Sequence, residues 1–141
     1  MKNFGSTCQF EHERNKDLMR AYNEEISGRK HIYLPDVFKA VVKKPSARFW
    51  VSERRAAIVI SRLLNGDNLE DMRPLKRKMF KEIYRRAMKL KKNFPQLTLL
   101  QIAEHIVQQP APEFYLTPGS AKVIVYKIRK KQRKESKRKK G

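Results

Sequence analysis

The sequence predicts an all-α protein in which two tandem three-helix repeats pack together and a disordered basic tail follows. Three observations predict this class. Apolar residues, 40% of the chain, recur at helical spacing. Residues 42–64 have a counterpart at 107–129, and the net charge is +20. The expected divisions are a first repeat at 1–66, a linker at 67–72, a second repeat at 73–130 and a tail at 131–141.

The internal repeat is the strongest of these observations. Residues 42–64 read VKKPSARFWVSERRAAIVISRLL and residues 107–129 read VQQPAPEFYLTPGSAKVIVYKIR, shifted by 65 positions without a gap. The identical pairs are Val42 and Val107, Pro45 and Pro110, Phe49 and Phe114, and Ala56 and Ala121. Two unrelated amphipathic helices would share a period, but they would not share the loop with its proline and aromatic pair. We therefore interpret the chain as a duplicated structural unit.

Six helices are expected, three in each repeat. Apolar side chains at helical intervals place them at about 9–26, 35–44, 53–64, 74–92 and 99–109, with a sixth from 118 into the tail. Ser27-Gly28 and Asn65-Gly66 are stop signals after the first and third helices. Pro45 and Pro110 close the second and fifth, because proline extends a helix poorly. Strands are not expected, although RFWV and EFYL could each form a short extended segment.

Each expected helix start has a recognisable signal. Capping-box spacing relates Ser6 to Gln9 and Thr98 to Gln101. The third helix of each repeat has a good N-cap, and proline suits the first helical position; these residues are Ser52, Thr117, Pro74 and Pro118. The buried stripe of the third helices is expected at Ala56, Val59, Ile60 and Leu63, and at Ala121, Ile124, Val125 and Ile128.

The charge balance indicates a polyanionic partner. Thirty-four Lys and Arg residues stand against 14 Asp and Glu residues. Self-repulsion of this size disfavours a compact chain and is usually relieved by nucleic acid. The segment from Arg129 to Gly141 holds nine basic residues and one Glu, so the body before it is strongly basic as well.

The expected helix at 74–92 has an unusual surface. Around a narrow apolar stripe it carries one acid, Glu82, among the basic residues Arg73, Lys76, Arg77, Lys78, Lys81, Arg85, Arg86, Lys89, Lys91 and Lys92. A solvated helix normally mixes charge signs to gain i,i+4 pairs. We therefore expect this helix to lie beside a phosphate backbone, with the tail adding further non-specific contacts.

Little in the sequence favours catalysis. The histidines His12, His31 and His105 lie far apart and share no ligand-like spacing. In Glu11-His12-Glu13, consecutive helix positions point in different directions. The sequence contains no glycine-rich phosphate loop, nucleophile elbow or spaced carboxylate pair. We expect a non-enzymatic binding protein with no catalytic residues, no metal and no cofactor.

Cysteine use and hydropathy suggest the compartment. Cys8 is the only cysteine, which excludes an internal disulfide and a cysteine-rich metal site and fits a reducing environment. The N-terminus lacks an apolar signal core, and no uncharged run approaches the roughly 18 residues needed to span a bilayer. We expect a cytoplasmic, nucleoid-associated protein that makes no membrane contact.

The order of helices resembles the tri-helical helix-turn-helix DNA-binding domains over residues 18–64 and 83–129. In that family the third helix lies in the major groove and other elements hold phosphates. One departure is the segment between the second and third helices, roughly eight residues instead of three or four. With phrases such as RFWVSERRAAIVISRL and PAPEFYLTPGSAKVIVYKIRK, the chain also looks like uncharacterised small basic proteins of gut anaerobes and their mobile elements.

The resemblance implies base contacts from the outward residues of the third helices. Arg54 and Arg55 would donate to guanine edges, Ser120 would contact a base or phosphate, and Gly119 would permit close backbone approach. The full expected nucleic-acid-binding set is Arg54, Arg55, Ser61, Arg62, Gly119, Ser120, Lys122, Tyr126, Lys127, Arg77, Lys78, Arg85, Arg86, Lys130 and Lys131. A solvated charged face is the competing interpretation for each residue.

Two apolar features near the third helices each have two interpretations. Ile58 and Val123 lie on the outward face. We expect them to pack in a wider core between the two halves, in preference to contacting thymine methyls. The aromatic pairs Phe49-Trp50 and Phe114-Tyr115 are expected to anchor the core, in preference to stacking on bases.

Together these observations predict a duplex-DNA-binding protein that acts as a transcription regulator or an accessory factor of a mobile element. Two units in one chain predict a monomer with an internal pseudo-dimer that reads two half-sites. Because Glu53-Arg54-Arg55 differs from Pro118-Gly119-Ser120, the half-sites should differ. Two alternatives stay open: an RNA- or ribosome-associated protein, and a structural protein that packs nucleic acid without sequence preference.

Overall fold

A computed structural model describes the backbone of residues 6–140 and the side chains of residues 10–138. Within these residues the fold is all-helical, with six helices and no strand. The helices are α1 (Ser6–Ser27), α2 (Leu34–Lys43), α3 (Glu53–Leu64), α4 (Pro74–Asn93), α5 (Leu99–Val107) and α6 (Pro118–Lys140). The predicted all-α class and the predicted helices are confirmed, most of their ends lying within three residues of the expected positions.

The helix caps predicted from sequence are present wherever the side chains are described. Ser52 and Thr117 each accept a hydrogen bond from the backbone N–H three residues later, at 3.0 and 3.1 Å. Thr98 and Gln101 form the reciprocal capping box. The capping box expected at Ser6 lies outside the described side chains.

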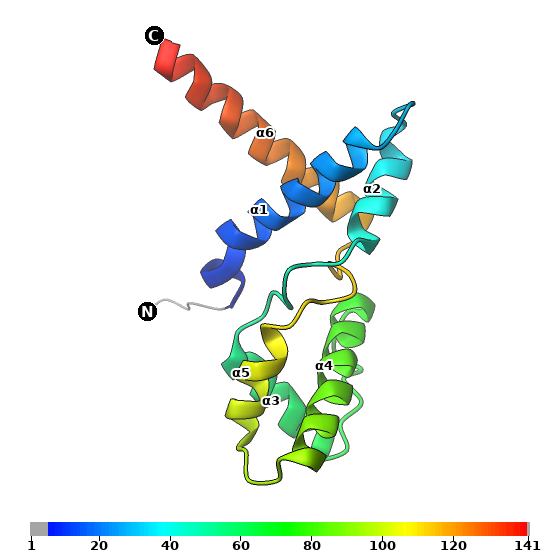
Figure 1. The fold of residues 1–141 in the computed structure, drawn as a ribbon, viewed down its shortest axis with the longest axis vertical. Helices are drawn as coiled ribbons and strands as arrows, with labels where there is room; N and C mark the ends of the chain where they lie inside the picture. Colours follow the sequence, from blue (N-terminus) through cyan, green and yellow to red (C-terminus); the bar gives the residue numbers. More distant parts are fainter. Residues whose placement is uncertain (1–5, 141) are drawn as a thin grey trace.

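The helices form two lobes, and each lobe combines helices from both sequence repeats (Figure 1). Helices α1 and α2 pack against α6, whereas α3 packs against α4 and α5. The third helix of each sequence repeat thus packs against the first two helices of the other repeat, so the two third helices are exchanged. We call these groups the α1–α2–α6 lobe and the α3–α4–α5 lobe.

The segments that lead into the third helices explain the exchange. Residues 44–52 and 108–117 leave one lobe, pass each other in antiparallel directions and enter the other lobe (Figure 1). At the crossing Ser46 and Ala111 exchange both backbone N–H···O bonds, at 2.9 and 3.0 Å. Segments of this length are too long for the tight turn of a helix-turn-helix, and they reach the neighbouring lobe instead.

Equivalent positions of the two repeats make equivalent bonds at this crossing. The Phe49 N–H donates to the Val107 carbonyl and the Phe114 N–H donates to the Val42 carbonyl, both at 3.0 Å. Phe49 and Phe114 differ by 65 positions, as do Val42 and Val107. The crossing therefore has an approximate two-fold symmetry, with Ser46 beside its axis.

Each lobe has a separate core. Phe49, Val59, Ile60, Phe80, Ile83, Ile102 and Ile106 fill the α3–α4–α5 lobe. Leu18, Val37, Phe38, Val41, Phe114, Ala121 and Val125 fill the α1–α2–α6 lobe. Phe49 is 1% exposed and Phe114 is 6% exposed, which confirms that these two rings anchor the core. The neighbouring rings are half-buried: Trp50 packs against the core of the α1–α2–α6 lobe, and Tyr115 packs against the core of the α3–α4–α5 lobe.

Buried polar groups hold the crossing in place. Asp17 of α1 accepts hydrogen bonds from the Ala47 N–H at 2.7 Å and from the Ser46 hydroxyl at 3.2 Å. Arg20 binds Asp17 at 2.7 Å and also donates to the Pro45 carbonyl at 3.1 Å. Because Asp17 is almost fully buried, its charge is stabilised by these donors.

The expectation that Ile58 and Val123 pack in a core is wrong. Their side chains are 50% and 52% exposed. The two halves of the molecule meet through the crossing segments, and the outward faces of α3 and α6 are left uncovered.

The expected disorder of residues 131–140 also differs from the structure, in which α6 continues as one helix through Lys140. Its first half is fixed by Ala121 and Val125 in the core, so the costly nucleus is already formed. Lys, Arg, Gln and Glu all propagate a helix well, and the described part has no proline after Pro118. The second half of α6 projects past α1 (Figure 1).

Candidate nucleic-acid interface

Two adjoining hollows form the candidate interface. The first, which we call the central hollow, has a volume of about 720 Å³ and is lined by Arg55, residues 71–76, residues 115–117 and Ser120. The second, the α4 hollow, has a volume of about 660 Å³ and is lined by Pro74, Arg77, Lys78, Lys81, Glu82, Arg85, Pro112, Glu113 and Tyr115. Both are lined by Pro74 and Tyr115, so together they form one groove along the start of α4.

The central hollow joins the two third helices. Arg55 lies in the first turn of α3 and Ser120 in the first turn of α6, and both line this hollow. They occupy equivalent positions of the two repeats, 65 residues apart. Arg73 and Lys76 add two more cations from the start of α4. The exchange of helices thus brings together two predicted site residues that are far apart in sequence.

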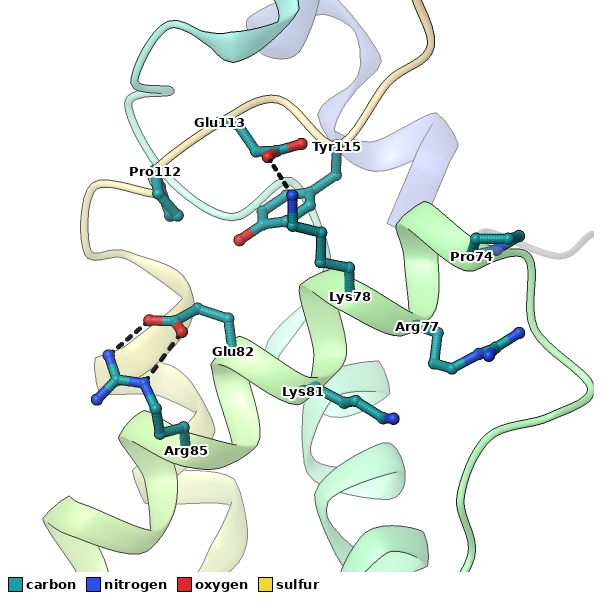
Figure 2. A pocket seen from close by; sticks show the side chains of 9 residues that line it. All are labelled: Pro74, Arg77, Lys78, Lys81, Glu82, Arg85, Pro112, Glu113 and Tyr115. Atoms are coloured by element: carbon teal, nitrogen blue, oxygen red, sulfur yellow. Dashed lines mark hydrogen bonds and ion pairs between the residues drawn. The ribbon is translucent and has the colours of Figure 1, made fainter.

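The α4 hollow is surrounded by charged side chains (Figure 2). Lys78 binds Glu113 at 2.7 Å, and Lys43 reaches the same carboxylate at 3.4 Å. Arg85 binds Glu82 at 2.8 Å. Lys81 extends away from both of these pairs in Figure 2. The two acids of this hollow are therefore paired with basic residues, whereas Lys81 has no acidic partner among the described residues.

Two pKa values describe the electrostatics beside this hollow. The hydrogen bond and the attraction of Glu113 raise the pKa of Lys78 above its usual range, so Lys78 stays charged. Burial, followed by the nearby charge of Glu113, raises the pKa of Tyr115 to about 12. The Tyr115 phenol consequently stays protonated at neutral pH and can act as a hydrogen-bond donor.

Four of the predicted site residues have acidic partners within the fold. Lys78 and Arg85 are paired as described above. Arg86 binds Glu82 at 2.7 Å and donates to the Pro110 carbonyl at 3.0 Å, which ties α4 to the crossing. Arg62 is also paired; its partners are Asp67, at 2.6 Å, and Asp71, at 2.9 Å.

The other predicted residues lie mainly on the outer surfaces. Arg54, Gly119, Lys122, Tyr126, Lys127, Lys130 and Lys131 are exposed, and Ser61 is half-buried. Lys122 lies over the Tyr126 ring, 5.6 Å from its centroid. None of these eight residues lines either hollow of the described structure.

Three basic residues of the groove were absent from the expected set: Arg73, Lys76 and Lys81. A signal for two of them was present in the sequence. Arg73, Arg77, Lys81 and Arg85 follow one another at intervals of four, which places them along one face of α4. Lys76 lies outside this row, although it belongs to the basic surface of the helix that was expected beside a phosphate backbone.

Glu82 gives a testable pH dependence. Hydrogen bonds from Arg85, and then from Arg86, lower its pKa from 4.5 to about 2. A lowered pKa in the folded state stabilises the fold above the ordinary value, and this contribution is lost as pH falls from about 4.5 towards 2. Solvent screens part of the interaction, so we expect Glu82→Gln to cost on the order of 1 kcal/mol at neutral pH.

Urea unfolding between pH 2 and 7 measures this contribution. The stability of Glu82→Gln should approach that of the unmodified chain as the pH approaches 2. The exposed residue Glu104 offers a matched control, Glu104→Gln, which should follow the unmodified chain at every pH. A Glu82→Gln deficit that stays constant down to pH 2 would contradict the assignment.

No family model, curated protein sequence or solved structure matches this chain. Among the described residues, no helix combines the length and the hydropathy that a membrane span requires. The same residues contain no group of three or more His, Cys, Asp or Glu side chains that could hold a metal ion.

Proposed function

We propose that this chain is a non-enzymatic protein that binds double-stranded DNA, as a regulator or as an accessory factor of a mobile element. The observation that carries the proposal is the groove made by the central and α4 hollows. Its cations without a carboxylate partner among the described residues are Arg55, Arg73, Lys76, Arg77 and Lys81. A groove with excess positive charge favours a polyanion, and a phosphate backbone supplies one.

Helix α6 supports the same proposal. It contains eleven basic residues and one acid. Residues 129–138 are all exposed, and Arg129 also donates a hydrogen bond to the Tyr22 hydroxyl. Like charges at i,i+4 destabilise an isolated helix, and a phosphate backbone removes this repulsion. The projecting half of α6 is therefore suited to non-specific contact with a duplex.

The third helices supply the proposed base contacts. By resemblance to tri-helical DNA-binding domains, their first turns would enter the major groove, where Arg54 and Arg55 suit guanine edges. Ile58 and Val123, which are exposed at equivalent positions, suit thymine methyl groups. The exposed apolar residues that do not fit a core thus have a role in this proposal.

The exchanged fold restricts the spacing of the two half-sites. In a two-fold dimer with separate recognition helices, half-sites lie about 34 Å apart. Here Arg55 and Ser120, from the first turns of α3 and α6, line the same hollow, so both turns border one groove. We therefore propose that the two half-sites adjoin and form one composite sequence without a spacer.

Selection from a random duplex library at near-physiological salt tests this proposal. We expect one composite motif, with one part lost in Arg54→Ala/Arg55→Ala and the other lost in Lys122→Ala/Lys127→Ala. A bidentate arginine contact to guanine contributes about 1–3 kcal/mol of discrimination, so the losses should be large enough to alter the motif.

A matched control changes two exposed basic residues that line neither hollow, Lys89→Ala/Lys92→Ala, and should retain the whole motif. Retention of both parts in the third-helix variants would refute base reading by these helices. Preference for A-form duplexes or RNA loops would favour the RNA-associated alternative. Equal binding to all duplexes would favour a packing protein without sequence preference.

A further inference from the structure

The residues that line the α4 hollow have counterparts in the first repeat, and at two of these positions the charge is reversed. The shift of 65 relates Lys78 to Glu13 and Glu113 to Arg48. The same shift relates the pair Glu82–Arg85 to Asp17–Arg20, and both pairs are bonded in the structure. The two repeats thus keep one ion pair in common, and beside it they carry opposite charges.

In the first repeat this position is occupied by a side chain of the protein itself. The Arg48 guanidinium lies over the Phe10 ring, 4.3 Å from its centroid, and 5.4 Å from the Trp50 ring centroid. It donates to the Phe49 and Val51 carbonyls, each at 2.9 Å. A cation therefore covers this region of the first repeat.

In the second repeat the equivalent position carries an acid. The equivalent residue, Glu113, is almost fully buried and is held by Lys78 and Lys43, and the space beside it is the α4 hollow (Figure 2). Arg77 and Lys81 border this space without a carboxylate partner among the described residues. The Arg77 Nε is buried and has no hydrogen-bond acceptor, although its Nη2 donates to the Met72 carbonyl.

The arrangement fits an anion with several acceptor oxygens. The bond to the Met72 carbonyl fixes the Arg77 guanidinium at the border of the hollow, where its charge has no carboxylate partner among the described residues. Lys81 supplies an exposed ammonium at the border of the same hollow. Phosphate oxygens accept both kinds of hydrogen bond, and arginine matches their geometry.

We propose that the α4 hollow binds a phosphate group through Arg77 and Lys81. The identity of that group as a backbone phosphate of duplex DNA rests on the proposed function. The binding of phosphate itself rests only on the hollow and its charges. The two statements can therefore be tested separately.

The test compares Arg77→Gln/Lys81→Gln with the control Lys89→Gln/Lys92→Gln, which removes the same charge from exposed positions of α4 that do not line the hollow. Thermal unfolding is followed in inorganic phosphate and in chloride at equal ionic strength. We expect phosphate to raise the Tm of the unmodified chain and of the control, and to leave the Tm of the hollow variant unchanged.

The second arm measures how affinity for a random-sequence duplex depends on salt. Loss of one phosphate contact lowers the slope of log K against log salt by about 0.9. We expect the slope to fall by about 1 in the hollow variant and to stay constant in the control. Circular dichroism of both variants verifies that the helices are intact.

The outcomes separate the two statements. A phosphate effect that depends on the hollow, without duplex binding, would support the hollow and overturn the proposed function. The second outcome is that phosphate has no effect on the Tm and that all three proteins bind the duplex equally. This result would overturn phosphate binding by the hollow and leave the proposed function standing. An equal loss of the phosphate effect or of duplex affinity in the hollow variant and the control would also overturn phosphate binding by the hollow, because the loss would then depend on total charge.

Discussion

Two separate polypeptides, residues 1–66 and residues 67–141, are expected to fold only when they are mixed. Each lobe of the structure requires helices from both of them, since α6 completes the α1–α2–α6 lobe and α3 completes the α3–α4–α5 lobe. Without α3, the α4–α5 pair would expose the apolar surface that Val59 and Ile60 cover. Burying a side chain of this size contributes about 1.5–3 kcal/mol, and several such losses exceed the stability of a small lobe.

Far-UV circular dichroism and size-exclusion chromatography with light scattering test this expectation. Each polypeptide alone should be largely unfolded, and an equimolar mixture should regain helical signal as a 1:1 complex. The Tm of that complex should rise with concentration, because folding is then coupled to association. A chain cleaved after the exposed Gly66 serves as a control, since both halves then begin in the folded arrangement. Cooperative folding of residues 1–66 as a monomer would contradict the exchange.

Removal of residues 131–141 is expected to leave the fold intact and to abolish most non-specific duplex affinity. Among the described part of this segment, residues 131–138 are all exposed, and the last fully buried residue of α6 is Val125. The segment carries seven basic residues and one acid. Because the shortened chain can no longer bind several of the phosphates, its affinity at low salt should fall by on the order of 100-fold or more. The salt slope should fall by about 0.9 for each phosphate that is no longer bound.

Fluorescence anisotropy with a random-sequence duplex, at several salt concentrations, measures both quantities. A chain of full length in which the basic residues after Lys130 are replaced by Gln is the matched control, because it keeps the length and most of the helix propensity. It should lose as much affinity as the chain that ends at Lys130, and both should unfold at the Tm of the unmodified chain. An unchanged salt slope would show that the projecting half of α6 does not contact the duplex.

The local structure of this protein follows from its amino-acid sequence. The six helices, the caps Ser52 and Thr117 and the core anchors Phe49 and Phe114 follow from spacing, capping chemistry and hydropathy. These are short-range effects, in which a residue and its neighbours within one or two turns decide the outcome. The net charge of +20, which indicates a polyanionic partner, also follows from the sequence alone.

Part of the candidate site was also predictable. The basic surface of α4 and the first turns of the third helices were expected, and both border the groove. The sequence did not show which cations are free. Lys78 and Arg86 are engaged by acids or carbonyls that folding brings near them, whereas Lys81 has no acidic partner in the described structure. The Arg86–Glu82 pair is local, but the Lys78–Glu113 pair and the bond from Arg86 to the Pro110 carbonyl depend on residues far away in sequence.

Which helices pack together could not be predicted from the sequence. The two repeats carry equivalent apolar stripes, with Ala56 and Ala121 at corresponding positions, so each third helix fits either lobe. Hydropathy therefore cannot distinguish a repeat that keeps its own third helix from one that exchanges it. The long segments that cross at Ser46 and Ala111 resolve this choice, because they carry each third helix across to the other lobe, and so bring Arg55 and Ser120 to one hollow.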